Sequence, residues 1–129
     1  AGTEAPRLVD PLWLEREFER EDVAHFVMVD TDDTALGVFG LRFHKRERRA
    51  HLVRVAIDPD RRGEGLSAVL MRAAIDLSRD ERMLRLTLNV FASNEAARAA
   101  YERAGFFTYE FARSRVDPTG WMLRMLKPL

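Results

Sequence analysis

The spacing of apolar residues between positions 51 and 90 changes from that of a strand to that of a helix and back, which restricts the possible folds more than any other feature. His51–Ile57 is predicted to be a strand that stops at Asp58-Pro59, because proline cannot donate to a ladder. Apolar residues then recur every three or four positions from Gly65 to about Arg79, which predicts an amphipathic helix. Leu84–Val90 alternates strictly between apolar and polar residues, which predicts another strand.

The segment before this unit has the pattern of a helix followed by a hairpin. A short helix is predicted from Pro11 to about Arg20, because Asp10 is a good N-cap and proline is favoured at the first helical position. The apolar runs His25–Val29 and Ala35–Phe43 are separated by polar turn-forming residues. This arrangement predicts two antiparallel strands.

The segment after the unit is predicted to hold one more helix and two strands. Glu95–Arg103 is predicted to be a helix, with Ser93 or Asn94 as its cap. Phe106–Phe111 and Trp121–Leu126 are predicted to form a closing hairpin. The complete order, α-β-β-β-α-β-α-β-β, predicts an α/β fold with a mixed sheet and helices packed on it.

Composition restricts the class of protein. With 129 residues, 47% apolar and 33% charged, we expect one soluble globular domain, residues 1–129. The 21 basic and 21 acidic residues cancel, so we expect neither nucleic acid nor a membrane as partner. The chain has no cysteine, which excludes disulfides and thiolate metal sites; we expect no metal and a cytoplasmic location. No apolar run approaches the roughly 20 residues of a membrane-spanning helix.

The turn between the predicted strand and helix, residues 58–67, has the properties of an anion site. The first N–H groups of a helix lack intrahelical partners, and the helix dipole favours negative charge there. Gly63 and Gly65 allow a phosphate to approach the backbone, while Arg62 adds charge and Ser67 a hydroxyl donor. An ordinary glycine-containing loop is the alternative. The turn is neither a nucleotide P-loop, since Gly-Lys-Ser/Thr is missing, nor a dinucleotide-binding fingerprint.

Two stretches together resemble the GNAT family of acetyltransferases. Residues 62–67, Arg-Gly-Glu-Gly-Leu-Ser, resemble the family's Arg/Gln-x-x-Gly-x-Gly/Ala signature, and residues 55–59 resemble the strand that leads into it. Residues 94–106 resemble the Asn-x-x-Ala-x-x-x-Tyr helix closed by Gly-Phe. Ser67 departs from the signature, which has glycine or alanine there. The similarity covers roughly residues 24 to 127.

The resemblance implies a fold, a co-substrate and a set of binding residues. The fold is the acyl-CoA N-acyltransferase fold, a mixed, mostly antiparallel central sheet flanked by helices. Only one short predicted helix precedes His25, so we expect the usual first strand to be absent. Acetyl-CoA is the implied co-substrate. The residues expected to bind it are Val55, Ile57, Arg62, Gly63, Gly65, Leu66, Ser67, Asn94 and Tyr101.

The implied reaction transfers an acetyl group to a primary amine, which requires a base, an oxyanion donor and an acid. By resemblance the oxyanion donor is a backbone N–H near Ala56 or Ile57. Tyr101 is the candidate acid for the leaving thiolate, because its reference pKa of about 10 keeps it protonated. The alternative is that Tyr101 only packs.

The base is less well defined by the sequence. His51 begins the third predicted strand, where many family members carry a glutamate, although a lone histidine on a strand is more often structural. Glu110 and Asp117 on the closing segment are rival candidates. His25 and His44 have no supporting context.

Other interpretations concern binding without catalysis. The cleft could serve an acyl-CoA sensor or partner-binding module, which the expected loss of a strand favours and the retained Tyr101 disfavours. A nucleic-acid-binding fold is disfavoured by zero net charge, and the run 44–49 is predicted to be a solvated loop. Phe106, Phe107, Tyr109 and Phe111 are predicted to be core and a possible homodimer contact. The amine could belong to a small molecule or a protein.

Overall fold

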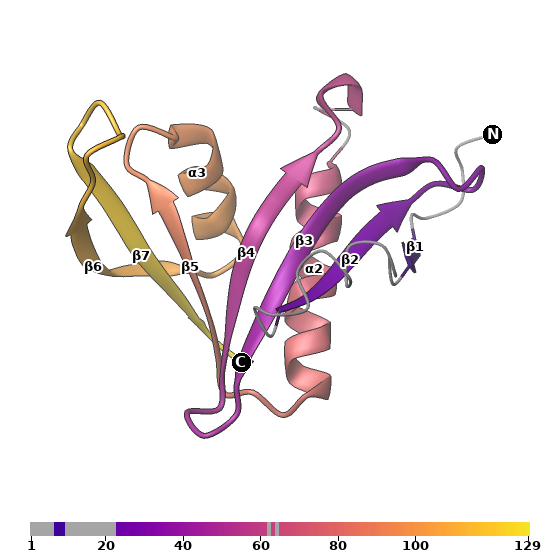
Figure 1. Ribbon diagram of the computed structural model, residues 1–129, viewed down its shortest axis with the longest axis horizontal. Coiled ribbons are helices and arrows are strands. Elements are labelled where there is room, and N and C mark those ends of the chain that lie inside the picture. Colours follow the sequence, from indigo (N-terminus) through magenta and orange to yellow (C-terminus); the bar gives the residue numbers. More distant parts are fainter. Residues whose placement is uncertain (1–6, 10–22, 62, 64) are drawn as a thin grey trace.

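The computed structural model describes residues 7–9, 23–61, 63 and 65–129 (Figure 1). The helix predicted from Pro11 to Arg20 lies outside the described residues. The described helices are α2 (Leu66–Asp80), α3 (Glu95–Arg103) and a 3₁₀ turn at Pro59–Arg61.

Within the described residues, seven strands form one sheet in the order β1-β2-β3-β4-β5-β7-β6. Every neighbouring pair is antiparallel except β4 and β5, which are parallel. The predicted mixed, mostly antiparallel sheet is therefore confirmed, and β7 lies between β5 and β6. The strands are β1 (Arg7–Val9), β2 (Val23–Val29), β3 (Ala35–His44), β4 (Arg49–Ile57), β5 (Arg85–Phe91), β6 (Phe107–Arg113) and β7 (Trp121–Pro128).

The prediction that the first strand is absent is wrong, because β1 supplies it. Its three residues pair antiparallel with the end of β2, in register Arg7 with Val29 and Val9 with Val27. A three-residue strand shows no periodicity in a sequence, and its position is determined by pairing with β2. The N-terminal segment thus covers part of an edge that would otherwise carry unpaired N–H and C=O groups.

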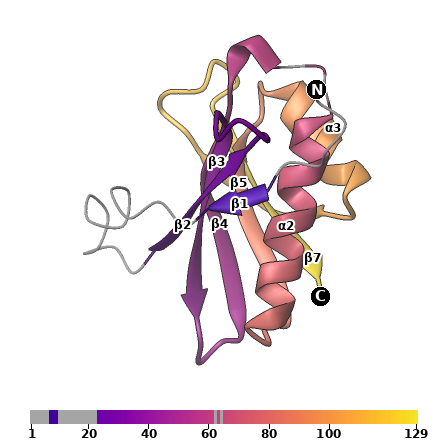
Figure 2. The same cartoon turned by 90° about the vertical axis from the view of Figure 1, so that its right-hand side faces the viewer.

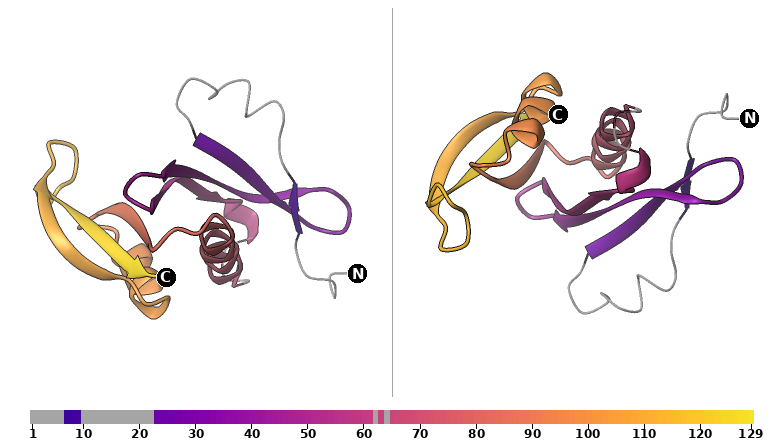
Figure 3. Two further views of the ribbon diagram at one scale, coloured as in Figure 1. Left: turned by 90° about the horizontal axis from the view of Figure 1, so that it is seen from below. Right: turned by 90° about the horizontal axis from the view of Figure 1, so that it is seen from above.

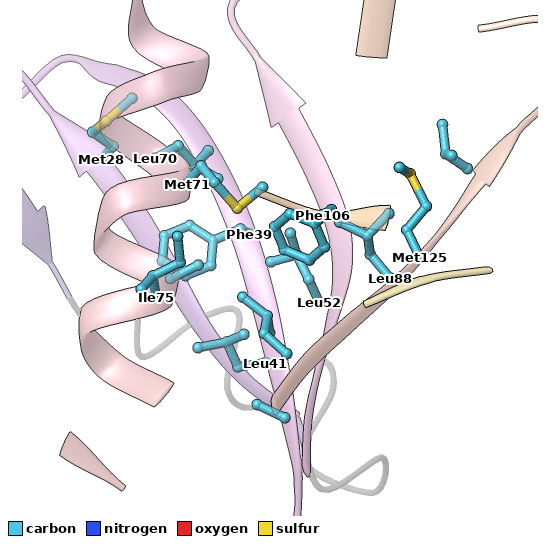
Figure 4. Close-up of a cluster of buried hydrophobic side chains, with 14 of the residues drawn as sticks. Met28, Phe39, Leu41, Leu52, Leu70, Met71, Ile75, Leu88, Phe106 and Met125 are labelled. Carbon is cyan, nitrogen blue, oxygen red and sulfur yellow. The ribbon is translucent and has the colours of Figure 1, made fainter. Parts of the chain in front are cut away.

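Both α2 and α3 lie on the same face of the sheet (Figures 2 and 3). The main core fills the space between this face and α2 (Figure 4). Along β5, Leu86, Leu88 and Val90 belong to this core, so Thr87 and Asn89 lie on the opposite face. We call the face that carries α2 and α3 the helix face, and the other the open face.

The prediction that the aromatic residues of the closing hairpin are core is wrong for three of the four. Phe106 is buried, but Phe107, Tyr109 and Phe111 are 50%, 49% and 63% exposed. Their strand, β6, is the outermost strand of the sheet on that side. An alternating pattern identifies a strand but does not show whether another element covers it.

The sheet divides at its centre, where β4 and β5 pair over four residues only, Arg49–Leu52 with Arg85–Leu88. Beyond Leu52 the two strands separate (Figure 1). The last five residues of β4 therefore lack a strand partner on the β5 side, and this division positions the candidate active site.

Candidate active site

A cleft with a volume of about 1050 Å³ lies between the end of β4, the glycine-containing turn, α2 and α3. Eight of the predicted binding residues line it: Val55, Ile57, Gly63, Gly65, Leu66, Ser67, Asn94 and Tyr101. Arg62 lies outside the described residues, and His51 is not among the residues that line the cleft. Segments far apart in the sequence thus meet at one cavity.

The turn before α2 requires glycine at two positions. Gly63 and Gly65 have φ angles of 87° and 73°, in the left-handed region that side chains with a β-carbon rarely adopt. A β-carbon on either residue would have no atom of the described residues within 4 Å, so this part of the structure leaves the space above the turn open. Gly65 is the N-cap of α2 and offers no side-chain hydrogen bond to its first turn. Those N–H groups and the helix dipole are therefore available to an anion.

The wall formed by β4 contains a β-bulge. Along β3 the pairing advances two residues from Gly40 to Val38, whereas β4 advances three, from Val53 to Ala56. Arg54 within this bulge has a φ of 53°, which is unusual for a residue other than glycine. A bulge increases local twist and bends its strand. We attribute the divergence of β4 from β5 in part to this extra residue.

Backbone donors of β4 face the cleft. The N–H of Asp58 donates to the Leu36 carbonyl of β3 at 2.8 Å. Because successive N–H groups along a strand point to opposite sides, the N–H of Ile57 points away from β3, toward the space that β5 has left. Of the two residues proposed for the oxyanion donor, Ile57 has this orientation.

Two residues of the predicted Asn-to-Phe helix line the cleft, Asn94 at the N-cap of α3 and Tyr101 within α3. The Asn94 side chain accepts a hydrogen bond from the N–H of Ala97 at 3.2 Å, which confirms it as the N-cap. Tyr101 is half-buried, and its ring packs on Phe106 with centroids 5.9 Å apart. Burial raises the pKa of Tyr101 above 10, so its hydroxyl keeps its proton near neutral pH.

His51 lies on the open face, since its neighbours Ala50 and Leu52 belong to the core on the helix face. Its Nδ1 is 2.7 Å from the hydroxyl oxygen of Thr87 on β5. Burial is the main cause that lowers the pKa of His51 from 6.5 to about 4, and positive charge on four nearby groups lowers it further. These groups are Arg49, Arg42, His44 and Arg124. A neutral imidazole is able to accept a proton, although a pKa this low makes it a weak base.

The rival bases have other contacts. Glu110 forms an ion pair with Arg124 at 3.7 Å and does not line the cleft. Asp117 accepts hydrogen bonds from Ser93 and Thr119. Burial tends to raise the pKa of Asp117, but these hydrogen bonds outweigh it and lower the pKa. Asp117 therefore links the β6–β7 loop to the residue before the α3 cap.

Cationic residues of the cleft were missed by the sequence analysis, apart from Arg62. Among the cleft residues that the structure describes, five are cationic and none is a carboxylate. The zero net charge of the chain concealed this local excess. One part of this excess could have been predicted from the sequence. Arg72 and Arg79 are seven residues apart and therefore share a face of α2. The five are Arg61, Arg72, Arg79, Arg103 and Lys127.

Two further properties concern metals and membranes. In the described part of the chain, no group of three or more His, Asp or Glu side chains could hold a metal ion. No described helix has the length and apolar character needed to cross a membrane.

Comparison with known proteins defines the class. The acetyltransferase (GNAT) family matches residues 2–106 of the chain. The chain therefore belongs to the GNAT family, and it is an N-acetyltransferase by this membership.

The relatives differ in how much of their own length this chain covers. The chain is 29% identical over 106 residues to a Bacillus subtilis protein provisionally named a [ribosomal protein bS18]-alanine N-acetyltransferase, covering 79% of this chain and 68% of the relative. It is 33% identical over 89 residues to the mycothiol acetyltransferase of Streptomyces coelicolor, covering 69% of this chain and only 29% of that relative. The IAA acetyltransferase from Bacillus cereus superposes with a TM-score of 0.81 over 97% of this chain and 100% of that one, at 16% identity, which shows the common fold.

Proposed function

We propose that this chain transfers the acetyl group of acetyl-CoA to a primary amine, and that the cleft described above receives acetyl-CoA. One observation carries the proposal: a cationic cleft begins at a glycine turn on a helix N-terminus and reaches the division between β4 and β5. The turn suits a pyrophosphate, and the division leads to backbone donors that no described strand uses.

The residues of the cleft suit the two parts of the co-substrate. The open space above Gly63 and Gly65 admits phosphate oxygens to the first N–H groups of α2, with the hydroxyl of Ser67 nearby in the sequence. Arg62, which the resemblance implicates, belongs to the proposal although it lies outside the described residues. Val55 and Ile57 provide the wall for the apolar arm of the co-substrate.

The acceptor amine must lose a proton to react. A lysine-like amine has a pKa near 10.4, so roughly one in two thousand is neutral at pH 7. The ammonium form loses this first proton to water, since an imidazole with a pKa of about 4 is too weak a base to take it. We assign His51, acting from the open face, as the base for the second proton, which the attacking nitrogen loses as the C–N bond forms, because its imidazole is neutral near pH 7. As the C–N bond forms, the N–H of Ile57 stabilises the charge on the carbonyl oxygen.

The departing thiolate must gain a proton as the C–S bond breaks. Tyr101 is assigned this role because it lines the cleft and stays protonated. With reference pKa values of about 10 and 8.5, the transfer is uphill by roughly 2 kcal/mol in water. A short hydrogen bond to developing negative charge reduces this difference.

The identity of the acceptor is the open part of the proposal. The two curated relatives described above are named for a ribosomal-protein alanine and for mycothiol, so both protein and small-molecule amines are candidates. Thiol release from acetyl-CoA should be measured with a panel of amines, amino acids and N-terminal peptides. Release with at least one amine supports the proposal. Binding of acetyl-CoA without release from any would indicate the acyl-CoA sensor instead. A cytoplasmic location, a single domain and a homodimer remain predictions.

A further inference from the structure

Thr87 contacts three polar groups at the centre of the sheet. It is 1% exposed and pairs with His51 across the parallel β4–β5 ladder. Its hydroxyl oxygen is 2.7 Å from Nδ1 of His51, 3.2 Å from Nη1 of Arg49 and 3.3 Å from the carbonyl oxygen of Ala50. All three distances are within hydrogen-bonding range.

A hydroxyl has one hydrogen to donate and two lone pairs to accept with. The Arg49 guanidinium is only a donor and the Ala50 carbonyl is only an acceptor, so the hydrogen of Thr87 goes to Ala50 and one lone pair to Arg49. The remaining lone pair faces Nδ1 of His51. Each of the three contacts is a hydrogen bond only if Nδ1 carries the imidazole hydrogen. Nε2 then carries a lone pair.

The charges around His51 make this assignment relevant near neutral pH. Arg42 and His44 lie on β3, Arg49 precedes His51 on β4, and Arg124 lies on β7. With burial, they disfavour the imidazolium, so the ring holds a single hydrogen. Thr87 decides on which nitrogen that hydrogen lies.

We infer that Thr87 is a positioning residue that holds His51 as the Nδ1–H tautomer and so leaves Nε2 as the proton acceptor. The inference rests on the proposed function, in which His51 is the base. The amine proton moves to Nε2 as the C–N bond forms and the C–S bond breaks, and the imidazolium then releases it to water. Thr87 keeps its own proton throughout.

The tautomer is measured directly by nitrogen NMR on protein labelled at histidine. The chain has three histidines, and loss of a signal in His51→Gln assigns the one required. We expect Nδ1–H in the wild type and in Thr87→Ser, and a loss of this preference in Thr87→Val, which keeps the shape and removes the hydroxyl. An Nε2–H tautomer in the wild type, or an unchanged tautomer in a folded Thr87→Val, overturns the inference.

Kinetics then test the consequence for catalysis. Thr87→Val should lower kcat by about 10- to 100-fold, part of what a general base contributes, without changing the KM for acetyl-CoA. Thr87→Ser should restore kcat, and Thr87→Val should have no further effect in a His51→Gln background. Thr108→Val on β6 is the matched control and should leave kcat unchanged. Full kcat in His51→Gln overturns the base assignment and with it the catalytic role of Thr87. The NMR measurement distinguishes this outcome from the other, in which His51 is the base but Thr87 does not fix its tautomer.

Discussion

At the scale of residues, burial shifts the pKa of Tyr101 upward and that of His51 downward, for one physical reason. Low polarity disfavours whichever form is charged, which is the phenolate in one case and the imidazolium in the other. Near pH 7 one side chain therefore holds a proton to give and the other has a lone pair to accept one. The proposed acid lies on the helix face and the proposed base on the open face, and the raised pKa of Tyr101 and the lowered pKa of His51 disfavour proton transfer between them.

Tyr101→Phe tests the acid. The variant keeps the ring and its contact with Phe106, so a change reports on the hydroxyl. Because protonation of the thiolate occurs in the transition state, we expect kcat to fall by about 10- to 1000-fold with little change in acetyl-CoA affinity. Steady-state kinetics and a binding titration measure the two quantities. An unaltered kcat would leave Tyr101 as a packing residue, with water as the proton donor.

The pKa of His51 should be close to 4 in a proton NMR titration, compared with 6.5 for an ordinary histidine. If His51 is the base, its protonation should lower kcat as the pH drops toward that value, below the range in which protonation of the amine itself lowers the rate. Between pH 6.5 and 4 the unfolded chain binds a proton that the folded chain does not, so His51 makes stability decrease as pH is lowered through this window. Arg49→Gln should raise the pKa of His51, whereas Arg72→Gln on the helix face should not. A pKa near 6.5 would contradict the prediction.

At the scale of elements, the glycine turn and α2 act together. Gly65 is the N-cap of α2 and has no side chain, so it leaves the first N–H groups of the helix without a side-chain cap. On the opposite wall, β4 no longer pairs with β5 beyond Leu52, and the N–H of Ile57 points toward the space between the two strands. Both features leave backbone N–H groups that no described strand or cap accepts, at the place where the proposed co-substrate would bind.

Gly65→Asp tests this unit. Acetyl-CoA should raise the melting temperature of the wild type by mass action, and the aspartate should abolish this shift by placing bulk and negative charge beside the phosphates. Gly120→Asp is a matched control, because Gly120 also has a positive φ, of 82°, and open space around its β-carbon position. It lies in the β6–β7 loop and should keep the shift. A folded Gly65→Asp protein with the full shift would contradict the site assignment.

At the scale of the whole molecule, the two edges of the sheet differ. At one edge the short β1 pairs with residues 27–29 of β2. At the other, β6 is outermost and carries exposed aromatic side chains at Phe107, Tyr109 and Phe111. The predicted homodimer contact would belong to the β6 edge, since exposed aromatic groups of this size favour association.

Deletion of residues 1–9 tests the edge at β1. Without β1, the N–H and C=O groups at the end of β2 lose their partners, and we expect larger species that increase with concentration. Sedimentation velocity measures this, and deletion of residues 1–6, which retains β1, is the control. If both deletions sediment like the complete chain, β1 does not protect the edge.

The sequence predicted the strand-helix-strand unit of residues 51–90 and the helix α3, because apolar periodicity and helix capping are properties of neighbouring residues. Helical spacing predicted Gly65 to Arg79, and the structure has Leu66–Asp80; the range Glu95–Arg103 was predicted without error. The glycine turn could also be predicted, since positive φ and a helix start leave a signature in adjacent residues. Most of the proposed binding residues lie in this turn and in α3.

The features that only the tertiary structure decided arise from pairing between segments that are distant in the sequence. For the described elements other than β1, the sequence alone determined where strands and helices occur, because periodicity and capping act over a few residues. The place of β7 between β5 and β6, the division of β4 from β5, the pairing of β1 and the contact of Thr87 with His51 depend on register, which no local pattern encodes. The cationic cleft likewise arises only when α2, α3 and β7 bring separate arginines and a lysine to one cavity in a chain of zero net charge.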